Sequence, residues 1–214
     1  MASILVGIVG YDPFVRSFPL GPSFLERLRA TSWGDENVEI CEFNWSPVAI
    51  VQDLQSRSAP LKRVVLVSTT DRARKPYSVH VRRWVPAPIA PDALQERIFE
   101  AVTGVVHVDN LLAIGAHFGV WPPEVFSVEV EFPFVNVGDY ILQALDRVGS
   151  NGAQISDAEP DERTGHLIEQ ALRMTRQAVL KGAEGLAGLL PLHARDLTPV
   201  ARFCHSHSVD AGVG

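Results

Sequence analysis

Two unbroken apolar segments constrain the fold of this chain more than any other feature. The first is ILVGIVG at residues 4–10, and the second is RVVLVS at residues 63–68, which is apolar through its centre. A strand without polar alternation is buried on both faces, and such strands occur in parallel sheets covered by helices on both sides. The chain is therefore expected to form an α/β domain with a mainly parallel central sheet.

Helical and strand-like patterns alternate between and after these two segments. Further strands are predicted at residues 38–43, 79–85 and 124–131, and helices at residues 23–30, 47–54, 92–102 and 110–118. Ser23 is the expected N-cap of the first helix. This alternation is typical of a three-layer α/β/α architecture.

The C-terminal third differs in composition from the rest. Residues 148–160 are polar and contain glycine, which indicates a linker, and residues 162–181 carry an apolar stripe broad enough for a long helix that packs on a core. The last residues are small and polar. We therefore expect an α/β domain over residues 1–150, a linker and C-terminal helix over residues 151–188, and a disordered tail over residues 189–214.

Charge and hydropathy exclude several classes of function. The 214 residues carry 19 Lys and Arg against 25 Asp and Glu, a net charge of −6. Nucleic-acid binding is not expected, because the densest basic group, Arg72, Arg74 and Lys75, has the composition of a solvated loop. No apolar run of about 18 residues occurs, so no membrane span is expected. The N-terminal segment does not have the pattern of a secretory leader, and the two cysteines, Cys41 and Cys204, are far apart in the sequence. The chain is therefore expected to be cytoplasmic, with two free thiols and no disulfide.

Motifs that would define a common active site are absent. Gly7 and Gly10 lack the third glycine of a dinucleotide fingerprint, and no Gly-x-Ser-x-Gly sequence occurs. Ligands in open α/β sheets bind beyond the carboxyl ends of the strands, so the loop after residue 10 is the first candidate region. His107, at the entrance of a predicted helix, is the histidine best placed to reach that edge of the sheet.

The order of several segments resembles a known family. These segments are ILVGIVG, GPSFLERLRA, KRVVLVSTT, VVHVDNLLAIGAHFGVWPPEVFSVEVEFP and VNVGDYI, which together span residues 3–148. In this order they resemble the hydrogenase maturation proteases, nickel-dependent endopeptidases that trim the C-terminus of the large subunit of [NiFe]-hydrogenase. The resemblance implies the same α/β fold and a protein partner.

The same resemblance implies three metal-ligand positions. Ser17 and Phe18 fall where the family has a carboxylate in the first loop, and Ser68 falls where the family has an aspartate at a strand end. Only the histidine is retained, as His107. Asp12 and Asp71 are close enough in sequence to the lost positions to be possible substitutes.

Two functions follow from this pattern. The first is a non-catalytic accessory or binding protein of hydrogenase assembly, which would need no cofactor and would bind a protein such as the hydrogenase large subunit. The second is an active endopeptidase that holds nickel with rearranged ligands. An α/β domain of unrelated function is a third reading. Two carboxylates near His107 would favour the enzyme, whereas a pocket filled by Phe18 would favour the binding protein.

Overall fold

The central sheet of this computed structural model has the predicted, mainly parallel arrangement. The structure describes residues 3–13, 15–16, 18–103, 106–132, 159–186 and 188–198. Within them, six strands form one sheet in the order β2-β1-β3-β5-β4-β6, and all neighbours are parallel except β4 and β5. The strands are β1 (Ser3–Val9), β2 (Val38–Phe43), β3 (Leu61–Thr70), β4 (Ser78–Val85), β5 (Glu124–Glu131) and β6 (Leu190–His193).

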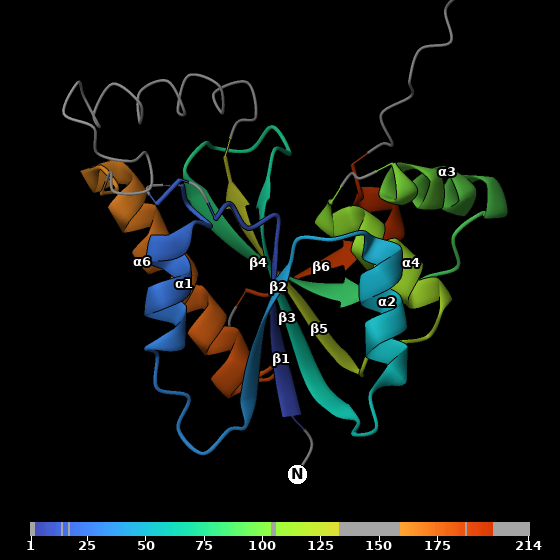
Figure 1. The fold of residues 1–214 in the computed structure, drawn as a ribbon, viewed down its shortest axis with the longest axis horizontal. Helices are drawn as coiled ribbons and strands as arrows, with labels where there is room; N and C mark the ends of the chain where they lie inside the picture. Colours follow the sequence, from blue (N-terminus) through green and yellow to red (C-terminus); the bar gives the residue numbers. More distant parts are fainter. Residues whose placement is uncertain are drawn as a thin grey trace, which may run out of the picture.

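Helices cover both faces of the sheet, as Figure 1 shows. The helices are α1 (Pro22–Arg29), α2 (Pro47–Ser56), α3 (Pro91–Val102), α4 (Val108–His117) and α6 (Glu162–Lys181), followed by a short 3-10 turn, η4 (Ala194–Asp196). Helices α1 and α6 pack on one face, and α2, α3 and α4 pack on the other. The fold is therefore the expected three-layer α/β arrangement.

Strand β1 shows why its sequence has no polar alternation. Ile4, Val6 and Ile8 pack with α1 and α6, while Leu5 and Val9 pack with α2 and α4. All five side chains are at most 2% exposed. Both faces of the strand therefore require apolar residues, which is the physical basis of the continuous run.

The long helix α6 is part of the same hydrophobic core as β1. Leu167, Ile168 and Ala171 are buried in the cluster that includes residues of β1, β3 and β5. The predicted boundary near residue 150 lies outside the described residues. Among the helices that the structure describes, α6 included, none is both long enough and apolar enough to span a membrane.

The first part of the region predicted as a disordered tail is structured. Leu190–His193 forms β6, which pairs in parallel with β4, and both Leu192 and Leu197 are buried. A four-residue strand containing a proline has no recognisable period, and its order depends on the edge that β4 offers. Residues 199–214 of the predicted tail lie outside the described residues.

Two helix starts also differ from the sequence prediction. Helix α1 has Gly21, not Ser23, at its N-cap, and Ser23 is buried in the first turn. Gly21 approaches the carbonyl oxygen of Val15 so closely that a Cβ there would lie 2.3 Å from it. Helix α4 begins at Val108, two residues before the predicted start, because the His107 side chain caps it.

Candidate functional site

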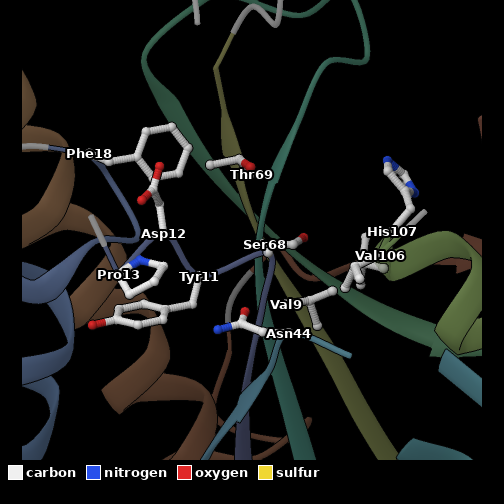
Figure 2. Close-up of a pocket in the computed structure, with 12 residues that line it drawn as sticks. Val9, Tyr11, Asp12, Pro13, Phe18, Asn44, Ser68, Thr69, Val106 and His107 are labelled. Atoms are coloured by element: carbon white, nitrogen blue, oxygen red, sulfur yellow. The ribbon is translucent and has the colours of Figure 1, made fainter. Parts of the chain in front are cut away.

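A cavity of about 460 Å³ lies at the carboxyl ends of β1, β2 and β3, beside the first turn of α4 (Figure 2). Ligands of open α/β sheets bind at this edge, and Gly10, with a positive φ of 77°, turns the chain from β1 into the loop that forms one wall. The cavity is lined by Val9, Gly10, Tyr11, Asp12, Pro13, Phe18, Asn44, Ser68, Thr69, Val106, His107 and Val108.

The structure brings most of the sequence-predicted site residues together in this cavity. Phe18, Ser68, His107 and the possible substitute Asp12 all line it. Figure 2 places Asp12 and Phe18 on one side, His107 on the other side and Ser68 between them. Asp71 is exposed beyond the end of β3 and does not line the cavity. Ser17 lies outside the described residues.

The tautomer of His107 follows from a hydrogen bond that its ring accepts. Its Nδ1 accepts a hydrogen bond of 3.2 Å from the backbone N–H of Asp109, which caps α4. A neutral imidazole that accepts at Nδ1 carries its proton on Nε2, and this tautomer is assigned from the bonding partner. Burial lowers the pKa of His107, against the opposing effect of the Asp109 carboxylate, so the ring is neutral at pH 7.

Ser68 presents a buried hydroxyl to the same cavity. The residue is 2% exposed, and its Oγ has no hydrogen-bond partner among the described residues. Figure 2 shows this hydroxyl directed into the space between Thr69 and His107. A buried hydroxyl without a partner costs roughly 1–3 kcal/mol, so Ser68 is an unusual residue for the end of a core strand.

The opposite wall combines an aromatic ring with a carboxylate. Phe18 is 8% exposed and packs edge-to-face on Phe132, with 5.7 Å between the ring centroids. Asp12 accepts a hydrogen bond of 3.2 Å at Oδ1 from the backbone N–H of Val15, so the carboxylate helps to fix the loop. This wall is therefore mainly apolar and carries one negative charge.

These side chains do not fit the nickel site that the family resemblance implies. A divalent cation with open positions needs several deprotonated ligands. The described residues that line the cavity offer one carboxylate and one imidazole whose Nε2 carries a proton. The Ser68 hydroxyl is neutral, and the Phe18 ring cannot ligate. Throughout the part of the chain that the structure describes, no three His, Cys, Asp or Glu side chains are grouped as metal ligands.

A buried charge network directly behind His107 was missed by the sequence analysis. The interpretation of Arg72 as a solvated loop residue is wrong, because its side chain is 9% exposed and forms ion pairs with Asp109 and Glu129, both fully buried. Arg74 pairs with Glu129 and Glu131 in the same network. The available signal was Glu129 and Glu131 in the second half of β5, where they alternate with Val128 and Val130, since buried carboxylates require cationic partners.

The same network also binds Thr198, the last residue that the structure describes, to α4. The backbone N–H of Thr198 donates to Asp109 Oδ2 at 2.6 Å, and Arg97 Nη2 donates to the Thr198 carbonyl at 2.6 Å. Arg97 also donates to Asn110 Oδ1. The first turn of α4, which carries His107 at its cap, is therefore held by charged groups from several elements.

Comparisons with known proteins find similar chains among solved structures. No family model and no curated protein matches the chain. Among solved structures, the hydrogenase 3 maturation protease is 17% identical, with 89% of this chain and 97% of that chain covered and a TM-score of 0.48. The hydrogenase maturating endopeptidase HybD from Escherichia coli is 15% identical, with coverages of 85% and 94% and a TM-score of 0.47.

A third similar structure is the endopeptidase HycI from E. coli, which is 17% identical, with 91% of this chain and 99% of that chain covered and a TM-score of 0.46. These three solved structures carry names from the family that the sequence resembles. Likenesses at these scores concern the path of the chain and carry no argument about the side chains of the cavity.

Proposed function

We propose that this protein is a non-catalytic, cytoplasmic accessory protein of [NiFe]-hydrogenase assembly. It would keep the architecture of a hydrogenase maturation protease and bind a protein partner, for which the hydrogenase large subunit is the candidate that the sequence resemblance supplies. It would need neither nickel nor another cofactor. The support comes from the order of the sequence segments and from the composition of the cavity at the sheet edge.

The chemistry of the cavity is the observation that carries this proposal. Phe18 and Ser68 occupy the positions where the resemblance implies carboxylate ligands, and both line the cavity together with His107. Loss of two charged ligands removes most of the Coulomb attraction for a cation. Changes to residues behind the ligands already weaken metal affinity by about 10- to 100-fold, so loss of the ligands themselves has a larger effect.

Calorimetric titration with Ni²⁺ and Zn²⁺ tests the proposal. We expect no saturable binding to the wild-type protein, and the same result for His107→Ala. Tight one-to-one binding that His107→Ala abolishes would contradict the proposal. The double variant Phe18→Glu/Ser68→Asp is the positive control, because it returns carboxylates to the wall and the floor of the cavity.

Binding of the partner needs a separate experiment. Purified hydrogenase large subunit with its C-terminal extension intact should form a complex with this protein in size-exclusion chromatography. Intact-mass measurement should show that the large subunit keeps its full length. A shortened subunit would contradict the non-catalytic assignment.

One observation favours the alternative of an active endopeptidase with rearranged ligands. Asp12 lines the same cavity as His107 and is the possible substitute that the fold brings to it. If this alternative holds, nickel-dependent shortening of the large subunit is expected, and Asp12→Asn should abolish it. Asp71→Asn is the matched control, because Asp71 does not line the cavity.

A further inference from the structure

We propose that a second cavity, between β4 and the C-terminal half of α6, binds a monocarboxylate that carries an apolar chain, such as a medium-chain fatty acid. None of its lining residues is shared with the cavity beside His107. The proposal is therefore independent of the proposed function, and neither nickel nor a partner protein takes part in it.

This second cavity has a volume of about 710 Å³, which lies within the range of small-ligand sites. Its walls come from β4, from the last turns of α6 and from the connection between α6 and β6. Strand β6 pairs only with residues 82–85 of β4, so the first half of β4 has no second neighbouring strand among the described residues. The lining residues are Arg74, Val79, His80, Val81, Arg82, Met174, Gln177, Lys181, Gly185, Leu186, Gly188, Leu189 and Leu190.

Apolar side chains form much of the wall of this cavity. Val81, Met174, Leu186 and Leu189 pack against the hydrophobic core but are only partly buried. Leu190 is 63% exposed. An apolar ligand chain would remove this surface from water, which is favourable in proportion to the area covered.

The lysine at the end of α6 selects the charge of the ligand. Lys181 has no ion-pair partner among the described residues. Arg74, which also lines the cavity, is already paired with Glu129 on β5. Arg82 is paired in the same way with Asp196. No carboxylate of a described residue lines the cavity, so a carboxylate ligand would find one free cation, whereas a cationic ligand would find no counter-charge.

A glycine in the connection after α6 keeps the Lys181 side chain at the cavity. A Cβ on Gly185 would lie 2.5 Å from Lys181 Cβ and 3.3 Å from Lys181 Cδ, so the aliphatic stem of the lysine packs directly on the glycine. Gly185 itself lines the cavity. The stem therefore extends the apolar wall, and its single charge matches a ligand with one carboxylate.

Isothermal titration calorimetry of the full-length protein with sodium octanoate, below the concentration at which octanoate forms micelles, tests the proposal. We expect saturable binding of one octanoate per chain. Octylamine and 1-octanol carry the same apolar chain without the carboxylate and should bind at least fivefold more weakly. Sodium butyrate keeps the carboxylate but lacks four CH₂ groups, so it should bind roughly 10- to 100-fold more weakly.

Variants of the lysine test which group holds the carboxylate. Lys181→Met keeps an apolar stem and removes the charge, so it should weaken octanoate binding by roughly five- to tenfold, and Lys181→Arg should restore most of the affinity. Arg173→Met is the matched control, because it removes a charge from the same helix and Arg173 does not line the cavity. This control should leave the affinity within about twofold of wild type.

The apolar wall has a matched pair of variants as well. Leu190→Ala should weaken octanoate binding several-fold, because less apolar surface remains to be covered. Val102→Ala should not, since Val102 is similarly exposed, at 61%, but does not line the cavity. Both side chains are exposed, so the Tm of the two variants should stay close to that of wild type.

Several results would overturn the proposal. Absence of saturable octanoate binding would do so, as would equal affinity for octanoate and octylamine, or equal losses in Lys181→Met and Arg173→Met. In ¹⁵N NMR of the full-length protein, octanoate should shift Val79, Val81 and Gly185, and shifts confined to residues around His107 would also overturn it. None of these results bears on nickel binding or on the large subunit, so failure here leaves the proposed function unaffected.

Discussion

Removal of the Arg72 guanidinium is the most informative perturbation of this fold. The group donates to Asp109 and Glu129, which are fully buried, and it also donates to the Asp196 carbonyl and the Thr198 hydroxyl. Breaking a buried ion pair on one side costs about 3–5 kcal/mol, because a charge is left without its partner. Arg74 still pairs with Glu129, which places the expected cost for Arg72→Met at about 3–4 kcal/mol.

Urea unfolding at pH 7 measures this loss, which corresponds to a decrease in Tm of roughly 6–16 °C for a chain of this size. Arg27→Met is the control, because Arg27 and its partner Glu169 have side chains 44% and 63% exposed. Exposed pairs contribute only about 0–1 kcal/mol. A loss for Arg72→Met that is no larger than the loss for the control would refute the reasoning.

The same variant has a defined pH dependence. Burial acts to raise the pKa of Asp109, but His107, Arg72 and the backbone N–H of Thr198 together hold it below its ordinary value of 3.8. A carboxylate with a lowered folded-state pKa stabilises the protein above its unfolded-state pKa, and this contribution is lost as the pH falls through the folded-state pKa. The stability difference between wild type and Arg72→Met should therefore narrow below about pH 4.

Three further predictions concern single residues. The ring of His107 should titrate below pH 6.5 in an NMR titration, because burial lowers its pKa, and a titration midpoint above 6.5 would contradict this prediction. The free energy of unfolding should therefore decrease as the pH falls from 6.5 toward that pKa, and His107→Gln should remove this pH dependence. Burial raises the pKa of Cys41 to about 11, so mass spectrometry should show slower alkylation by iodoacetamide at pH 8 than for a free cysteine, and an equal rate would count against it. A Cβ on Gly7 would lie 2.4 Å from Phe43 Cε2, so Gly7→Ala should cost about 1–3 kcal/mol in urea unfolding. Gly165→Ala, with nothing within 4 Å of its Cβ, should instead gain about 0.5–1 kcal/mol, and equal effects of the two substitutions would disprove the steric argument.

The central strands β1 and β3 could be predicted from the sequence because they are buried on both faces and therefore appear as continuous apolar runs. The run at residues 4–10 predicts a parallel strand, and β1 is paired in parallel on both sides. Strand β6 could not be predicted in this way. Its four residues have no clear pattern, and they are ordered by pairing with β4, which is remote in sequence.

Some features of the candidate site could likewise be predicted from the sequence, and others could not. Its location beyond β1 and β3 and the participation of His107 follow from strand order and from the general rule for α/β sheets. The tautomer of His107 could not be predicted from the sequence, because it depends on the hydrogen bond from the backbone N–H of Asp109, which forms only when His107 caps α4. That the Ser68 hydroxyl has no hydrogen-bond partner among the described residues likewise depends on which groups surround it after folding.

The sequence by itself determined the α/β class, because hydrophobic period and burial on two faces are properties of neighbouring residues. The tertiary structure alone decided the role of Arg72, which the sequence presents as one of three cations in a turn. Its partners Asp109 and Glu129 are 37 and 57 residues away. Long-range charge pairing leaves no local pattern, so only packing of β3, β5 and α4 against one another reveals it.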